Sequence, residues 1–458
     1  MSLVAPAPRT STRGSARRVV LLTVLLGRPR RQGVAALILP VIAFAVTTAI
    51  LLTVVGGTVM FLTDPRMGIN RELYAMLSIL ALILLLVPTA TLGAAAARLS
   101  SRRRDDRLAT LRLLGATSGE VSAMTVLEAS ATALVGAVGG VALYVLALPL
   151  LGLLPFFGGP VGAGALWVGP LGLLLVVLAV VLLATASAVT GLRRVRLTPL
   201  GVRRRTDAPP RRLRMLILSA LGIVAVGAAV ASFGSFGAML APVVALAVLL
   251  GLFAGAMALV NLIGTPIVAA RGRAMARRAT TAARLIAGRE LAAHAASAWR
   301  RVSAIAMISF IAVVGGSGMA LAAIAGTDDT DPLFADISTG VLVTLGAGFL
   351  LLACSVGVTQ AASVLEDREL IVGLDRMGVP SGQVQAARRL TVFVPLRWAA
   401  LGGAAVGAVL ALPMVGISVI VAPLSLIVIG TTFVAGFALV LGAVAASTPL
   451  VDAIRRTA

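Results

Sequence analysis

Long uninterrupted runs of apolar residues constrain this chain more than any other feature of its sequence. Many of these runs reach about 20 residues, the length that an α-helix needs to cross a hydrocarbon core of ~30 Å. Of the 458 residues, 59% are hydrophobic and 12% are charged, whereas about a quarter of the residues in soluble domains are charged. The sequence therefore predicts an all-α polytopic membrane protein.

The positive charge is unevenly distributed along the chain. The formal net charge is +22, and arginine supplies it alone because the sequence contains no lysine. The arginines cluster in every second loop between the apolar runs, which is the positive-inside pattern of membrane proteins. The pattern predicts about ten spans with both termini in the cytoplasm, and it argues against nucleic acid as the reason for the charge.

The predicted spans fall into a 4 + 2 + 4 order. A cytoplasmic or interfacial segment at 1–33 precedes a four-helix repeat at 34–205. A two-helix hairpin at 206–270 and a cytoplasmic interfacial segment at 271–301 lead to a second four-helix repeat at 302–458. Because two spans separate the repeats, both sit the same way up in the membrane. This parallel arrangement predicts two similar cytoplasmic faces, which fit a two-fold symmetric partner.

One charged loop motif occurs in both repeats, as DDRLATLRLLGATSGEV at 105–121 and as RELIVGLDRMGVPSGQV at 368–384. In the first copy, leucines at helical spacing predict an apolar side, and the next glycine suits the left-handed position where a helix ends. Thr117 and Glu120 then form a capping box that opens a new helix. Pro380 replaces Thr117 in the second copy, and proline is also tolerated at a helix start. The motif therefore predicts a helix, a corner, and a helix joined to a membrane span.

Repetition of the loop motif favours a partner-docking role over a helix that merely lies on lipid headgroups. The two copies differ in charge, because Arg112 aligns with Asp375, and this difference predicts unequal docking. The candidate docking residues are Arg107, Leu108, Leu111, Arg112, Leu114, Gly115, Thr117 and Glu120 in the first copy and Glu369, Ile371, Leu374, Asp375, Met377, Gly378, Pro380 and Gln383 in the second.

The third span of each repeat contains a Gly-x-x-x-Gly pair, which lets two helix backbones approach closely. These candidate packing residues are Gly136 and Gly140 in the first repeat and Gly403 and Gly407 in the second. Glycine is abundant in this chain, with 48 residues, so either pair alone is weak evidence.

Several polar and aromatic residues lie in or beside the predicted spans, and their positions suggest structural roles. Asn261 and Gln360 lie in apolar runs, where hydrogen bonds between helices are favoured over a polar substrate path. Phe156, Phe157 and Trp167 suit an aromatic belt at the outer membrane surface. Trp299 follows a helical stripe in the segment 271–301 and is predicted to anchor at the membrane interface. The sequence offers no catalytic set and no metal site.

The residues RLATLRLLGATSGEV, the following MTVLEAS, the pair Gly136 and Gly140, and LTPLGVRR resemble the FtsX-like permeases of ABC transporters, also called the MacB-type or type VII fold. The resemblance implies that the loop motif is a coupling helix seated in a cytoplasmic ABC ATPase dimer. It implies that ATP and Mg²⁺ bind to that ATPase and that this chain binds no cofactor, in keeping with a P-loop's need for lysine. The large external domain of similar ten-span permeases has no counterpart, because only TDPRMGINRE and TDDTDPLFAD occupy those outer loops.

The leading hypothesis is a permease subunit, without an ATPase site of its own, in a bacterial cytoplasmic membrane. It would couple ATP hydrolysis by a separate ATPase to export or extraction of a hydrophobic or amphipathic substrate such as a lipid, drug or antimicrobial compound. The alternative is a mechanotransmission subunit that transports nothing and controls an extracytoplasmic protein. A proton-coupled carrier is a third reading, which the scarcity of carboxylates in the spans disfavours.

Overall fold

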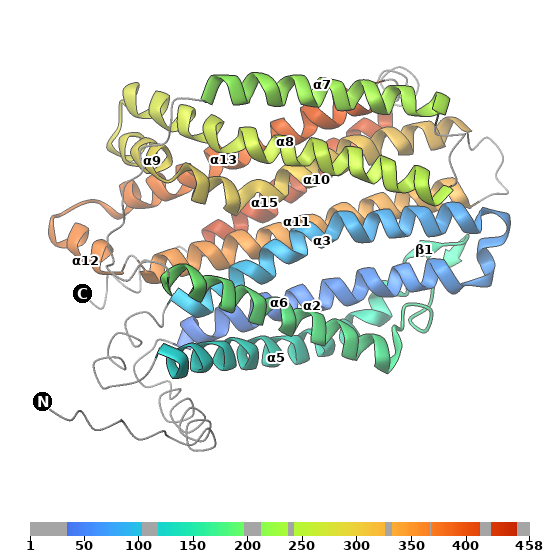
Figure 1. Cartoon of the computed structure of the whole chain (residues 1–458), viewed down its shortest axis with the longest axis horizontal. Helices are drawn as coiled ribbons and strands as arrows, with labels where there is room; N and C mark the ends of the chain where they lie inside the picture. The colour runs from blue at the N-terminus through green and yellow to red at the C-terminus, as the bar shows by residue number, and fades with distance from the viewer. Residues whose placement is uncertain are drawn as a thin grey trace, which may run out of the picture.

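The chain folds into a bundle of long helices that run side by side (Figure 1). This arrangement follows from the sequence, because an apolar segment in lipid must satisfy its backbone hydrogen bonds internally and a helix does so. The structure, a computed structural model, describes residues 34–102, 118–196, 212–236, 242–325, 332–366, 368–412 and 423–446.

The first repeat contributes four long helices and two short elements to the described chain. Its long helices are α2 (Val34–Thr63), α3 (Arg71–Arg102), α5 (Ser118–Leu151) and α6 (Gly169–Arg196). A 3-10 helix, η2 (Pro65–Asn70), joins α2 to α3. A small antiparallel hairpin, made of β1 (Pro155–Phe156) and β2 (Gly159–Pro160), lies between α5 and α6.

The remaining described elements are all helical. The region between the repeats forms α7 (Arg212–Phe236), α8 (Pro242–Arg277) and α9 (Ala282–Ala293). The second repeat forms α10 (Ala295–Ala325), α11 (Leu333–Glu366), α12 (Arg368–Arg376), α13 (Ser381–Leu410) and α15 (Pro423–Ala445).

The bundle has two ends, which lie at the left and right of Figure 1. The left end carries α9 and α12, and we call it the basic end. The right end carries η2, the β1–β2 hairpin and the start of α11, and we call it the hairpin end. Exposed arginines gather toward the basic end, among them Arg271, Arg273, Arg277, Arg278, Arg284, Arg289 and Arg300.

The structure confirms the predicted all-α polytopic class. Within the described residues, eight helices are long and apolar enough to cross a membrane: α2, α3, α5, α6, α8, α10, α11 and α13. The other two predicted spans correspond to α7 and α15, whose described apolar segments are the shorter Ile217–Val230 and Phe433–Ala445. The count of ten spans and the 4 + 2 + 4 order stay predictions.

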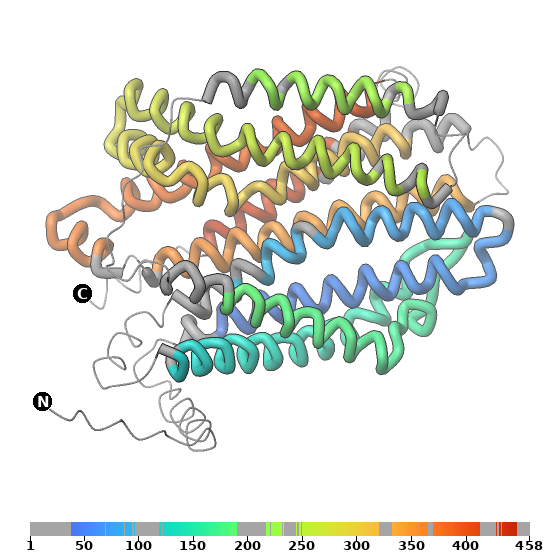
Figure 2. Tube along the Cα trace, in the orientation of Figure 1, coloured from blue at the N-terminus to red at the C-terminus, as the bar shows by residue number. Residues whose placement is uncertain are grey.

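The same pairing of helices occurs in both repeats. The first and third helices of each repeat pack on each other, α2 on α5 and α10 on α13. The second helices, α3 and α11, contact each other in the middle of the bundle, as Figure 2 also shows. Buried leucines on both, such as Leu85 and Leu351, belong to one apolar cluster that joins the repeats.

The predicted glycine pairs lie where these first and third helices are closest. A methyl group at Gly136 would lie 2.8 Å from the carbonyl oxygen of Val41, and one at Gly140 would lie 2.5 Å from that of Ala45. In the second repeat, a methyl group at Gly403 would collide with the backbone of Ala306. These three contacts are with backbone, which cannot rotate away as a side chain can, whereas a methyl group at Gly407 would lie 3.1 Å from the Val313 side chain.

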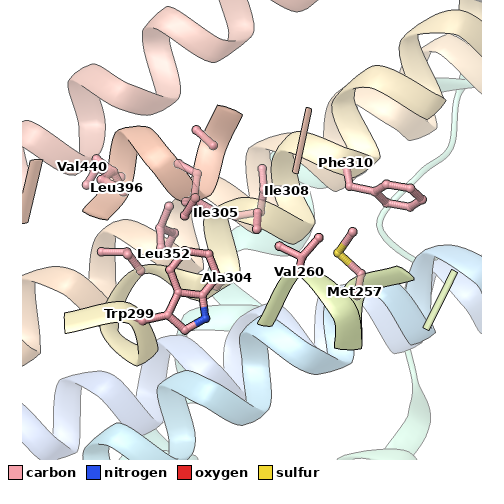
Figure 3. Packing of buried hydrophobic residues seen from close by; sticks show 14 of the residues in the cluster. Met257, Val260, Trp299, Ala304, Ile305, Ile308, Phe310, Leu352, Leu396 and Val440 are labelled. Atoms are coloured by element: carbon pink, nitrogen blue, oxygen red, sulfur yellow. The ribbon is translucent and has the colours of Figure 1, made fainter. Parts of the chain in front are cut away.

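The structure corrects the expected place of Trp299. This residue is 4% exposed and lies in the largest apolar cluster of the second repeat (Figure 3), so it is not an anchor at the membrane interface. Its indole Nε1–H donates to Asn261 Oδ1 at 3.0 Å. Gly264 lies against the indole ring, where any side chain would collide with it. On α8, Asn261 supplies a hydrogen-bond partner and Gly264 leaves space, so the indole can be buried. The role of Asn261 is therefore helix packing.

An aromatic cluster at the hairpin end corrects the expectation of an outer aromatic belt at Phe156 and Phe157. Phe156 is buried and packs edge-on against Phe61 at a centroid distance of 5.2 Å. Phe157 lies 5.3 Å from the Tyr74 ring and also carries the Arg66 guanidinium 4.9 Å above its own ring. The β1–β2 hairpin, which the sequence did not predict, turns these rings inward toward α2 and α3. Trp167 alone among the proposed belt residues is exposed.

One buried carboxylate links this cluster to the second repeat. Asp336, on α11 and 4% exposed, accepts a hydrogen bond from the Tyr74 hydroxyl at 2.6 Å. It also accepts from the backbone N–H of Phe157 at 3.0 Å. Close by, the Arg66 side chain hydrogen-bonds to Asp64 and holds the pKa of that carboxyl below its usual value. Asp336 therefore joins α3, the β1–β2 hairpin and α11 at one point.

Substitution of neighbouring glycines on α13 tests the close packing. Gly403→Ala should lower the unfolding temperature in detergent, because overpacking a filled contact costs ~1–3 kcal/mol. Gly402→Ala is the matched control, since a methyl group there meets nothing within 4 Å and alanine favours helix by up to ~1 kcal/mol. Equal stability of the two variants would contradict the assigned packing.

Substitution of Asp336 tests the link at the hairpin end. Asp336→Ala should destabilise the protein strongly, because hydrogen bonds to a charged group contribute ~1.5–3 kcal/mol each. The exposed Glu72→Ala, at the same end, should change stability by less than ~0.5 kcal/mol. A double-mutant cycle with Tyr74→Phe, followed by thermal unfolding, measures the coupling directly. Additive effects of the two substitutions would rule the hydrogen bond out as a stabilising contact.

Candidate functional site

Most of the first copy of the loop motif lies outside the described residues. This applies to Arg107, Leu108, Leu111, Arg112, Leu114, Gly115 and Thr117. Glu120 is described and lies in the first turn of α5, where a carboxylate interacts favourably with the helix dipole. The new helix begins at Ser118 and continues without a break through the third predicted span.

The second copy forms a short helix, a corner and a long helix. The corner is a Schellman motif: Val379 N–H donates to Leu374 O at 3.0 Å, and Gly378 N–H donates to Asp375 O at 2.9 Å. Gly378 has φ +75°, a left-handed conformation that glycine adopts without strain. This glycine therefore occupies the C′ position that the sequence predicts for the motif.

Pro380 and Gln383 begin the long helix that follows the corner. Pro380 is the N-cap residue, with extended backbone angles of φ −60° and ψ 137°, and its carbonyl accepts from Gln383 N–H at 3.1 Å. From Ser381 the helix α13 runs unbroken to Leu410 and contains the packing glycine Gly403. The corner is thus continuous with a helix that is packed tightly into the bundle.

The residues that α12 exposes differ from those that the sequence predicted to be exposed. Ile371 is only 4% exposed, so it is buried against the protein and is not part of an outward docking surface. Leu370, which the alignment of the two copies did not select, is 61% exposed, and Met377 is 71% exposed. With half-buried Leu374 they form an outward apolar stripe at spacings of four and three residues, which share one helix face. In the sequence, the spacing of Leu370 from Leu374 and Met377 could have identified Leu370 as a member of this exposed stripe.

The position of α12 sets it apart from the rest of the bundle. It lies at the extreme of the basic end (Figure 1) and contacts α11. Asp375 is half-buried and Arg376 is exposed, and Glu369 also lies on this helix. The exposed side of α12 therefore combines an apolar stripe with charges of both signs.

A second helix, α9, covers the basic end beside α8. Gly272 on α8 and Gly288 on α9 bring the two backbones together, since a methyl group at either would lie 2.9 Å from the carbonyl oxygen of the other. Thr281 caps the start of α9 by accepting a hydrogen bond from the Arg284 N–H. Leu285 and Ile286 are exposed on this helix. Both α9 and α12 thus present isolated apolar side chains among arginines.

The described chain also bears on the sequence predictions for metal ligands and for polar residues in the spans. Across the described ranges, no three His, Cys, Asp or Glu side chains are grouped as metal ligands would be. Gln360 is buried in α11, and Cys354 is half-buried there. What the site offers is mechanical: an exposed short helix, a fixed corner and a long packed helix.

Comparison with known proteins relates one part of the chain to a protein family. Residues 78–200, which run from α3 through α6 and include the first copy of the loop motif, match the family model described as FtsX-like permease C-terminal. Over this stretch the chain is similar to the FtsX-like permeases, a family of membrane subunits that have no ATPase site of their own and partner with a cytoplasmic ABC ATPase. No curated protein matches the chain.

Glycine substitutions at the corner and within α12 test the geometry of the corner. Gly378→Ala should loosen the end of α12, because a left-handed conformation costs a non-glycine residue ~1–2 kcal/mol. Gly373→Ala, within α12, should have the opposite effect, since a methyl group there meets nothing within 4 Å. Hydrogen exchange of the α12 amides in detergent measures both. Slower exchange in Gly378→Ala than in the unsubstituted protein would contradict the corner.

Proposed function

We propose that this chain couples ATP hydrolysis by a separate cytoplasmic ATPase to movement of its membrane helices, through the two copies of the loop motif. The observation that carries the proposal is the Gly378 corner, which joins exposed α12 directly to the packed helix α13. The ATPase would contact the apolar stripe of Leu370, Leu374 and Met377. The arginine-rich basic end is the cytoplasmic side by the positive-inside rule.

Displacement of α12 would be transmitted to the bundle in a defined order. The corner has its backbone hydrogen bonds satisfied within the Schellman motif, so it resists bending at that point. The start of α13 then moves with α12. Because Gly403 brings α13 against the backbone of Ala306, α10 cannot stay in place when α13 tilts. The second copy therefore acts as a lever on the first and third helices of its repeat.

Export or extraction of a hydrophobic or amphipathic substrate is the activity that we propose for the complex. Long stretches of the described spans face outward with exposed apolar side chains, for example Leu146, Leu150 and Leu182. A substrate dissolved in lipid would reach the helices from the side. A lipid, a drug or an antimicrobial compound fits this route.

A non-transporting mechanotransmission role is the second candidate, and one feature favours it. The hairpin end carries a tightly organised cluster in which Asp336 links elements of both repeats. Helix movement at the basic end would change that cluster, and with it any external surface that a periplasmic or cell-surface protein contacts.

Charge substitution on α12 tests the docking surface. The protein is co-purified with a candidate ABC ATPase from the same organism. Met377→Asp should weaken the complex about tenfold, which corresponds to ~1.4 kcal/mol for an apolar contact residue replaced by a charge. Leu285→Asp on α9 is the matched control, because Leu285 is also exposed at the basic end. Equal loss of ATPase binding in both variants, or no loss in Met377→Asp, would contradict the proposal that α12 is the docking surface.

Reconstitution separates the two proposed activities. Proteoliposomes containing the complex are given ATP and a panel of fluorescent lipids and amphipathic dyes. ATP-dependent flux that Met377→Asp abolishes supports transport. ATP hydrolysis without flux, together with an external protein that co-purifies, supports mechanotransmission.

A further inference from the structure

A groove between α13 and α15 opens near the basic end of the second repeat. It has a volume of about 250 Å³. The lining residues come from the first part of α13 and the last part of α15: Arg389, Val392, Phe393, Leu441, Val444 and Ala445. The pocket volumes typical for drug-sized ligands are ~300–1,000 Å³. The groove is therefore suited to one segment of a chain molecule rather than to enclosing a compact ligand.

The groove is apolar along its length and positively charged at one side. Val392 and Val444 are buried, whereas Phe393 and Leu441 are partly exposed. Arg389 is exposed and stands immediately before the apolar sequence that begins at Leu390. A cation thus sits just before the long apolar stretch of α13 and next to the apolar walls of the groove.

Among the residues that the structure describes, Arg389 has no partner that would compete with an anion. None of the groove residues is acidic. Arg389 makes no ion pair or hydrogen bond with any residue that the structure describes. The neighbouring Arg388 is directed elsewhere, because its Nη2 donates to Ser363 Oγ on α11 at 3.3 Å. The guanidinium of Arg389 is planar and offers paired donors that suit a phosphate.

We propose that this groove binds an anionic phospholipid of the cytoplasmic leaflet. The phosphate contacts Arg389, and an acyl chain lies along Phe393 and Leu441 over the two buried valines. Basic pockets between membrane helices on the cytoplasmic side are the general setting for such headgroups. The amphipathic shape of the groove matches a molecule with one charged end and an apolar chain.

The described parts of the two repeats differ at the position of this groove. In the alignment of the two loop motifs, Arg389 corresponds to Val126, so the first repeat has no cation at this position. In addition, α5 packs closely on α6, whereas described α13 and α15 do not pack closely on each other. The bound lipid would fill the interval between these two helices.

Lipid retention by the purified protein tests the site. Delipidated protein is mixed with phosphatidylglycerol or phosphatidylcholine and examined by native mass spectrometry. The unsubstituted protein should retain phosphatidylglycerol preferentially, and Arg389→Ala should reduce this retention about fivefold, the factor that corresponds to ~1 kcal/mol for one arginine at an anionic surface. Leu441→Trp should also reduce retention, because the indole fills an exposed wall of the groove while Arg389 stays.

Matched controls separate this site from general surface charge. Arg277→Ala removes another exposed arginine of the basic end and should leave retention unchanged. Glycerol phosphate at the same concentration should not displace the lipid, since it has no acyl chain. Equal retention of the two lipids, equal loss in Arg277→Ala, or displacement by glycerol phosphate would each overturn the proposal. The measurement uses neither ATP nor the ATPase, so it is independent of the proposed function.

Discussion

Close backbone contact between the first and third helices of each repeat is the constraint on which the rest of the structure depends. In lipid, helices gain little from the hydrophobic effect when they associate, so tight packing at small residues has to hold them together. Gly136 and Gly403 supply this contact against the backbones of Val41 and Ala306. Because a backbone cannot rotate out of the way, α5 and α13 are positioned rigidly. Any helix attached to them inherits that position.

The two ends of the bundle differ in the way they are held. At the basic end, α12 is attached through the Gly378 corner and exposes apolar side chains among charges. At the hairpin end, Asp336 accepts hydrogen bonds from Tyr74 and Phe157 and ties three elements together. Under the proposed function, the ATPase would push on α12 at the basic end, while the hydrogen bonds of Asp336 hold the hairpin end together.

The repeats share a plan but are chemically different. Asp375 occupies the position of Arg112 in the loop motif, and Arg389 occupies the position of Val126. The second repeat also leaves a groove between its third and fourth helices, whereas the corresponding described helices of the first repeat, α5 and α6, pack closely on each other. Under the two proposals, a symmetric framework contacts an ATPase at two places while the second repeat holds a lipid. The difference lies in side chains and in helix spacing, with the helical framework retained.

The sequence by itself determined the membrane class, the helical spans and the corner at Gly378, because hydropathy, periodicity and a required left-handed residue are local properties. Only the tertiary structure decided that Trp299 is buried, since its pocket needs Asn261 and Gly264 from another helix. The same holds for Asp336, whose partners are distant in sequence. Contacts between distant segments leave no periodic signal, so a single sequence shows which helices form but not which of their faces meet.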